Sequence, residues 1–295
     1  MTSGRRIFLV ACAAALGLFP NHPARAGVRV VGTDLLGLEA SQALYAFAGR
    51  ADFPLALAFD GSRPGFDQLK ARRADLALLV LAPDESAIGD ELQSITLAYH
   101  CVVVLVPASI PLEQITLPQL RDVFGESGSG TLDRWGDLGL EGEIAASAIA
   151  LHVPAVGQGI AVEFFRQTIL GDRRFKSTIE RYATPAELVL RLTGDRRGLA
   201  LAPVRPSDAA GLKIVRLAVR AGEPAFSPTA ENLHSGDYPL ALPLRMVFRR
   251  ESARTLRPLL QFLLGDAFVP VLEQAGVIPL APAARRQQAT ALEKP

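Results

Sequence analysis

The apolar and polar positions along the chain alternate between short strand-like runs and longer segments with helical spacing. Residues 28–32 form the first apolar run, and residues 35–48 follow with apolar side chains on one helical face. The same pair recurs as a strand at 55–59 and a helix at 66–73, and a third apolar run follows at 76–81. Strands that alternate with helices on this period predict parallel sheets with crossover helices.

A second group of elements is predicted from residue 100 onward. Residues 100–106 are continuously apolar, which is typical of a strand buried on both faces. Residues 116–125 predict a helix with Thr116 as its N-cap and Gly125 at its end. The remaining predictions are a helix at 185–192, strands at 198–202 and 238–248, helices at 255–265 and 268–276, and a last apolar run at 277–280.

The stretch 149–165 runs from a strand through a glycine-containing turn into an apolar helix. Gly157 and Gly159 let the backbone approach a ligand closely, and the first turn of any helix carries unpaired N–H groups. The turn Gly157-Gln158-Gly159 is therefore a candidate anion site. Most turns of this kind are plain connections between a strand and a helix, so that simpler alternative stays open.

The N-terminus has the pattern of a cleavable secretory signal. The basic pair Arg5-Arg6 precedes an apolar run at 7–19, and the small-residue site at 24–26 comes directly before Gly27. We therefore expect cleavage near Ala26 and Gly27 and a periplasmic location. We expect no lipid at Cys12, because cleavage there would leave a very short apolar run before the cysteine.

Composition excludes several classes of protein. After Gly27 no apolar run approaches the roughly 20 residues that a membrane-spanning helix needs. Loss of the signal removes three arginines and no acid, which turns 31 basic and 30 acidic residues into a slight excess of acids. This charge balance lacks the excess of basic residues that is typical of nucleic-acid-binding proteins. Cys101 then has no cysteine partner within the chain, so we expect no internal disulfide.

The sequence also lacks the patterns of catalytic and metal-binding proteins. His100, His152 and His234 show no metal-ligand spacing, and we expect neither a metal nor a cofactor. For His152, which lies in a strand-like run, a hydrogen-bonded core or edge histidine is favoured over a ligand. No nucleophile motif accompanies these histidines, so we expect no enzymatic activity.

Several short segments, in this order and spacing, resemble the phosphate-binding proteins of bacterial ABC transporters, within the two-lobed periplasmic solute-binding proteins. Residues 30–34 resemble the first ligand loop of that family. Residues 59–65 resemble the second, and Ala74-Asp75-Leu76-Ala77 follows it as in the family. Further similar segments lie at 115–125, 135–139, 236–240 and 276–280.

The resemblance implies an α/β protein with the type II periplasmic-binding-protein fold, in which two lobes are joined by two crossing strands and hold the ligand between them. Residues 27–103 and 241–284 would form lobe 1, and residues 104–240 would form lobe 2. We expect residues 285–295 to be a disordered tail. The candidates for the outgoing and returning crossings are residues 100–106 and 240–248.

Two ligand loops depart from the family pattern. Where the family has Ser-Gly-Thr in its fourth loop, with an arginine shortly before, this chain has Gln158-Gly159-Ile160 and no arginine at 153–157. Residues 81–85 likewise replace the Ser-Arg of the third loop. A charged hydrogen bond contributes about 1.5–3 kcal/mol, so an uncompensated loss weakens anion binding by about one to two orders of magnitude.

The candidate ligand-binding residues supply hydroxyls, one carboxylate, one guanidinium, an amide and backbone N–H groups: Thr33, Asp34, Gly61, Ser62, Arg63, Gly157, Gln158 and Gly159. Arg63 either neutralises the anion or is an ordinary solvated turn arginine. Asp34 either accepts a proton from a protonated oxyanion or caps a helix.

These features predict an exported receptor that captures phosphate or a related small oxyanion between its lobes. Its partners would be that small anion and the permease of an inner-membrane ABC transporter, and we expect a monomer. The alternative is a scaffold that kept the fold, lost phosphate binding and acts as a protein-interaction module. The departures at Gln158 and Ile160, together with the apolar loop at 81–83, favour that alternative.

Overall fold

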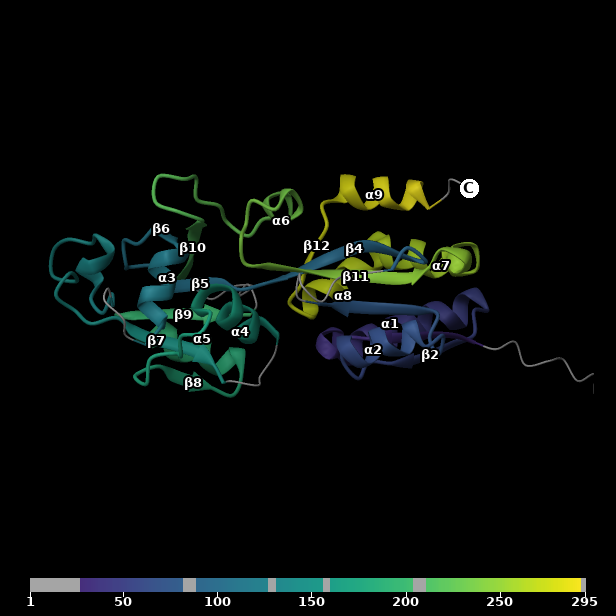
Figure 1. The fold of residues 1–295 in the computed structure, drawn as a ribbon, viewed down its shortest axis with the longest axis horizontal. Coiled ribbons are helices and arrows are strands. Elements are labelled where there is room, and N and C mark those ends of the chain that lie inside the picture. The colour runs from purple at the N-terminus through teal and green to yellow at the C-terminus, as the bar shows by residue number, and fades with distance from the viewer. Residues whose placement is uncertain (1–26, 82–88, 127–130, 156–159, 204–210, 293–295) are drawn as a thin grey trace, which may run out of the picture.

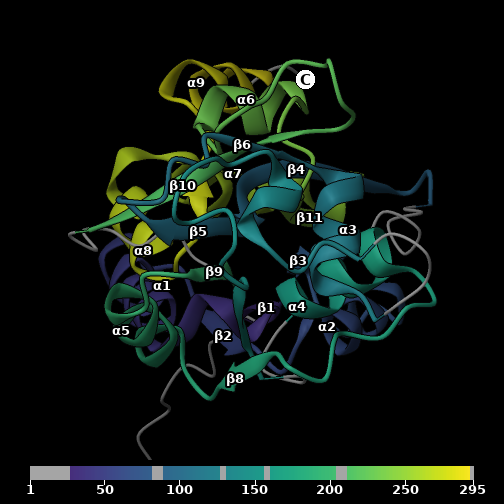
Figure 2. The same ribbon diagram turned by 90° about the vertical axis from the view of Figure 1, so that its left-hand side faces the viewer.

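The computed structural model describes residues 27–81, 89–126, 131–155, 160–203 and 211–292, and it contains two six-stranded sheets side by side (Figure 1). The first sheet has the order β12 (Ile278–Pro279), β4 (Leu92–Cys101), β11 (Ala241–Arg249), β3 (Leu76–Val80), β1 (Val28–Gly32) and β2 (Leu55–Ala58). The second has the order β6 (Gln114–Thr116), β10 (Leu212–Ala218), β5 (Val103–Pro107), β9 (Gly198–Ala202), β7 (Ala150–Pro154) and β8 (Glu180–Tyr182). Figure 2 views the molecule with the second sheet in front.

Helices accompany both sheets, as the alternating pattern predicts. Around the first sheet they are α1 (Gly37–Ala51), α2 (Ser62–Lys70), α7 (Ala253–Leu264), α8 (Val269–Gln274) and α9 (Pro282–Ala291). The middle of the chain forms α3 (Leu117–Phe124), α4 (Ile160–Phe165), α5 (Pro185–Gly194) and α6 (Ala230–Ser235). Single turns precede or extend several of them: Asp34–Leu36, Trp135–Leu138, the π turn Arg166–Leu170, Arg250–Ser252 and Asp266–Phe268.

The two sheets confirm the predicted α/β fold of two lobes, and we call the parts built on the first and second sheet lobe 1 and lobe 2. In lobe 1, β1 pairs in parallel with both β2 and β3, as the strand–helix–strand pattern requires. In lobe 2, β7 pairs in parallel with β8 and β9. The exact lobe boundaries, 27–103 with 241–284 and 104–240, stay a prediction.

The lobes are joined where β4 ends and β5 begins. Val102 lies between these strands, its N–H donates to the Leu240 carbonyl at 2.9 Å, and its own carbonyl accepts from the Tyr238 hydroxyl at 2.7 Å. The outgoing crossing therefore falls inside the predicted range 100–106. The return crossing reaches lobe 1 at Leu240, the first residue of the predicted range 240–248, and β11 then pairs with β3 and β4 along its length.

Two elements correct the sequence analysis. Helix α2 begins at Ser62 and not at the predicted residue 66, and Pro64 lies in its first turn, where proline is tolerated. Residues 285–291, expected to be disordered, belong to helix α9. Arg285 holds this helix in place: its side chain is buried and donates to the carbonyls of Leu280 and Leu264 and to Asp266.

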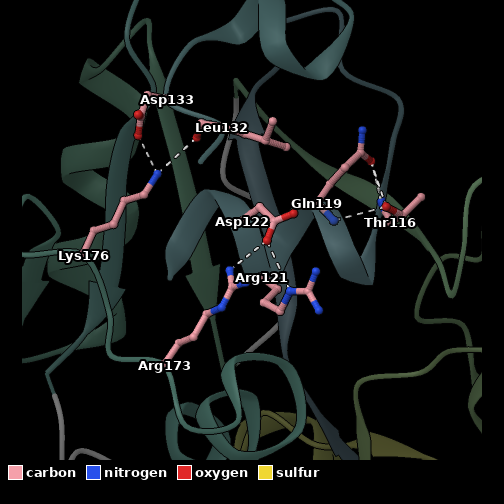
Figure 3. Close-up of polar contacts among 8 residues, drawn as sticks. All are labelled: Thr116, Gln119, Arg121, Asp122, Leu132, Asp133, Arg173 and Lys176. Carbon is pink, nitrogen blue, oxygen red and sulfur yellow. Dashed lines mark hydrogen bonds and ion pairs between the residues drawn. The ribbon is translucent and has the colours of Figure 1, made fainter. Parts of the chain in front are cut away.

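Lobe 2 carries a polar network around α3 (Figure 3). Thr116 caps this helix with a reciprocal bond to Gln119, which confirms the predicted N-cap. Farther along α3, Asp122 accepts hydrogen bonds from Arg121 at 3.2 Å and from Arg173, beyond the π turn, at 2.9 Å. The Arg173 contact fastens α3 to the segment that follows α4.

In the described part of the chain, no single helix is long and apolar enough to cross a membrane. The segments Arg250–Leu264 and Asp266–Gln274 reach that length and composition only as a pair, with a bend of 60° between them.

Candidate functional site

The first two predicted ligand loops meet at the carboxyl edge of three parallel strands. Strands β1, β2 and β3 end at the same edge of the sheet, which is where α/β sheets bind ligands. The Gly61 N–H donates to the Gly32 carbonyl at 2.8 Å and holds the loop after β2 against the end of β1. The hydroxyl oxygen of Ser62 accepts the Val80 N–H at 2.9 Å and joins the same loop to β3.

Close backbone packing at this edge depends on two glycines. Gly32 has φ of +139°, and a Cβ atom there would lie 1.9 Å from the Leu78 carbonyl oxygen. A Cβ atom on Gly65, in the first turns of α2, would lie 2.8 Å from the Cα atom of Gly32. Side chains are excluded at both positions, and this lets α2 begin directly over the end of β1.

Thr33 and Asp34 have different roles at the start of the next turn. Thr33 is buried, and its hydroxyl oxygen accepts the Leu35 N–H at 3.3 Å, which makes Thr33 the N-cap of the turn Asp34–Leu36. The alternative reading of Asp34 as a helix cap is therefore wrong. The Asp34 side chain is exposed instead, beside the loop that carries Ser62 and Arg63.

A cavity of about 340 Å³ opens at this edge between the lobes. Its polar lining comes from lobe 1 and consists of Thr33, Asp34, Gly61, Ser62 and Arg63. The rest of the lining is aliphatic: Leu35, Pro64, Val80, Leu81 and Ile160. Ile160 is the first residue of α4 and brings lobe 2 to the cavity, so the site lies between the two halves of the molecule.

Residues 20–267 match the family described as "PBP superfamily domain". The chain belongs to this family.

Solved structures agree with that assignment at the level of the fold. PstS from Borrelia burgdorferi superimposes with a TM-score of 0.70 at 14% identity, over 86% of this chain and 98% of that one. A possible phosphate binding protein from Planctomyces limnophilus DSM 3776 superimposes with a TM-score of 0.65 at 19% identity, over 90% of this chain and 97% of that one. An ABC-type phosphate transport receptor from Vibrio cholerae superimposes with a TM-score of 0.62 at 16% identity, over 85% of this chain and 99% of that one. The comparison with curated proteins finds no match.

Five of the eight predicted site residues of this PBP-superfamily chain line one cavity: Thr33, Asp34, Gly61, Ser62 and Arg63. The others, Gly157, Gln158 and Gly159, lie outside the described residues. That any of the eight binds a ligand stays a prediction. The aliphatic residues of the cavity wall were not predicted as site residues from the sequence. Leu81 and Ile160 were noted only as departures from a family pattern, and that departure was the signal that could have found them.

A second cavity, of about 750 Å³, lies in lobe 2 beside His152. The His152 ring is buried, with Nδ1 at 2.8 Å from the Tyr182 hydroxyl and Nε2 at 3.0 Å from Asp195. The Tyr182 hydroxyl donates to Glu180 at 2.6 Å. Burial raises the pKa of Tyr182, and the bond to Glu180 raises that pKa further. His152 is thus the hydrogen-bonded core histidine that its strand position predicts.

The described lining of the cavity between the lobes offers hydrogen bonding and charge: two hydroxyls, one carboxylate and one guanidinium on a partly aliphatic wall. Among the residues that the structure describes, no group of three or more His, Cys, Asp or Glu side chains is arranged to hold a metal ion.

Proposed function

We propose that this chain is an exported solute-binding protein that captures phosphate or a related small oxyanion between its lobes for ABC-type uptake. The observation that carries the proposal is the cavity itself, because ligand loops from three strand ends of lobe 1 meet Ile160 of lobe 2 there. The solved relatives named above are described as phosphate-binding or phosphate-transport proteins, which supports the same ligand class.

The polar half of the cavity suits an oxyanion. Ser62 and Thr33 already accept backbone N–H groups through their hydroxyl oxygens, so each hydroxyl proton is directed to a further acceptor such as an anion. The Arg63 guanidinium supplies positive charge to the lining. Asp34 adds negative charge and disfavours a fully deprotonated anion over one that retains a proton.

Release and delivery would follow from movement at the junction of the lobes. The contacts of Val102 with Leu240 and Tyr238 tie the two crossing segments together, and rotation about such a junction is a standard way to close a cleft around a ligand. In this proposal the closed monomer presents both lobes to an inner-membrane permease.

Calorimetry of the purified protein with phosphate, sulfate and methylphosphonate tests the proposal. We expect heat with at least one of these anions. Arg63→Ala should weaken binding by about tenfold or more and reduce the salt dependence of the affinity, since a charged hydrogen bond is lost. Arg50→Ala, at the exposed end of α1, is the matched control and should leave the isotherm unchanged. An unchanged isotherm for Arg63→Ala removes that residue from the site.

The scaffold alternative keeps one specific observation in its favour, the aliphatic side chains of Leu81 and Ile160 on the cavity wall. A folded protein that gives no heat with any of the anions would favour this alternative. In that case the PBP-superfamily fold would serve as an interaction module.

A further inference from the structure

The wall of the inter-lobe cavity combines polar groups with aliphatic side chains, and we call these its polar and aliphatic parts. The polar groups belong to the loops after β1 and β2, around Thr33 and Ser62. The aliphatic side chains of Val80 and Leu81 end strand β3, and Ile160 enters from lobe 2. A bare oxyanion suits the polar part, whereas the side chains of the aliphatic part offer it no hydrogen-bond donor.

The size of the cavity also exceeds the needs of a bare oxyanion. Its volume of about 340 Å³ lies at the lower end of the roughly 300–1,000 Å³ that is typical for small organic ligands. Since one water occupies about 30 Å³ in the liquid, an ion of a few heavy atoms would leave several waters against the aliphatic wall. An apolar substituent on the ligand would displace those waters favourably.

The charge of the described lining favours a singly charged ligand. Asp34 and Arg63 are the charged side chains among the described lining residues, and their formal charges cancel. A multiply charged anion would lose hydration in this cavity without a matching excess of positive charge. A singly charged ligand has a smaller desolvation cost there.

We infer that the ligand of this cavity is a small organic monoanion with an oxyacid head group and a short aliphatic substituent. The inference rests on the proposed function and narrows its ligand class. The head group would contact Thr33, Ser62 and Arg63, and the substituent would pack on Val80, Leu81 and Ile160.

Calorimetric titration of the purified protein with two ligand series tests this inference. One series is inorganic phosphate, methylphosphonate and propylphosphonate, and the other is acetate and butyrate. Each buried methylene tightens binding by about fourfold, and propylphosphonate has two methylenes more than methylphosphonate, so we expect it to bind about 15-fold tighter. The series that shows this gain identifies the head group as phosphonate or carboxylate.

A variant of the aliphatic wall gives an independent measurement. Ile160 is partly exposed, and Ile160→Thr keeps the branched shape while it adds a hydroxyl, so the fold should be retained. The gain with chain length should fall from about 15-fold to about fourfold, as expected for the loss of roughly one methylene-sized contact. Leu38→Thr, at a side chain 67% exposed on α1 and outside the cavity lining, is the control and should keep the full gain.

Two unfavourable outcomes are distinguishable. If inorganic phosphate binds at least as tightly as propylphosphonate and neither series gains affinity with chain length, the aliphatic substituent is refuted and the oxyanion-binding proposal stands. If none of the five ligands binds to a folded protein, the inference and the proposed function both fail.

Discussion

His100 is expected to make the stability of this protein depend on pH. It lies in β4 opposite Leu242 of β11, next to the junction between the lobes, and its side chain is 3% exposed. Among the described residues, neither of its buried ring nitrogens has a hydrogen-bond partner. Burial lowers the pKa of His100 from 6.5 to about 4. The folded protein therefore keeps a neutral imidazole under conditions in which the unfolded chain protonates it.

The sign and the size of the effect follow from this difference in pKa. Below pH 6.5 the unfolded state binds more protons than the folded state, so stability falls as the pH falls, and the loss levels off below about pH 4. The full difference corresponds to about 3 kcal/mol in the free energy of unfolding. Between pH 7 and pH 5, we expect His100 to lower the free energy of unfolding by about 2 kcal/mol.

Urea denaturation of the wild type and of His100→Leu at pH 7 and pH 5 measures this contribution of His100 to stability. Leucine fills a similar volume and cannot titrate, so the variant should lose about 2 kcal/mol less than the wild type between the two pH values. Other titrating groups are common to both proteins and cancel in the comparison. His234→Gln, at an exposed position of α6, should behave as the wild type. Parallel pH dependences for wild type and His100→Leu would refute the reasoning.

Two further substitutions test the junction and the ligand loops. Tyr238→Phe removes the hydroxyl that donates to the Val102 carbonyl at 2.7 Å and should lower the free energy of unfolding by about 1–3 kcal/mol in urea denaturation, because a buried acceptor is left without its donor. Tyr45→Phe, at a side chain 52% exposed, should change the free energy of unfolding little. Equal losses of stability in the two variants would contradict a structural role for the Tyr238 hydroxyl. Gly32→Ala places a Cβ atom against the Leu78 carbonyl in a strained backbone conformation and should cost about 2 kcal/mol or more. Gly49→Ala lies in helix α1, where a Cβ meets no atom within 4 Å, and should instead stabilise the protein by about 0.5–1 kcal/mol. A Gly32→Ala protein as stable as the wild type would show that the carboxyl edge of β1 relaxes easily around the added Cβ.

Two of the strands that the sequence predicted correctly are buried throughout. Residues 76–80 and 198–202 are buried at every position, and a continuous apolar run is the direct signature of that environment. Strand β4 was recognised only at its end, because residues 92–99 mix buried, half-buried and exposed positions without a clean alternation. Strand β10, in which only some positions are buried, was missed for the same reason.

Long-range contacts explain the errors at the C-terminus and at α2. The sequence of α9 is polar, and its position depends on Arg285, whose partners lie up to 21 residues earlier in the chain. The start of α2 at Ser62 depends on Val80, whose N–H binds the Ser62 hydroxyl oxygen. Neither contact leaves a periodic pattern in the sequence near the element that it positions.

The candidate site was foreseen only in its polar half, and the reason is chemical. Hydroxyls and charges in glycine-containing loops are unusual enough to attract attention, and Thr33, Ser62 and Arg63 do line the same cavity. Aliphatic side chains such as Leu81 and Ile160 usually belong to a core, so their sequence positions do not identify them as a binding surface. Only the fold shows that two of them, 79 positions apart, face one cavity.

This arrangement assigns different parts of recognition to different lobes. Lobe 1 carries the hydroxyls and the charged groups, so we expect it to hold the ligand's head group before the lobes close. Lobe 2 contributes Ile160 among the described lining residues, so in the proposed closure this side chain would add burial of apolar surface. Affinity gained on closure should therefore depend little on salt, whereas the initial capture of the anion should weaken as salt rises.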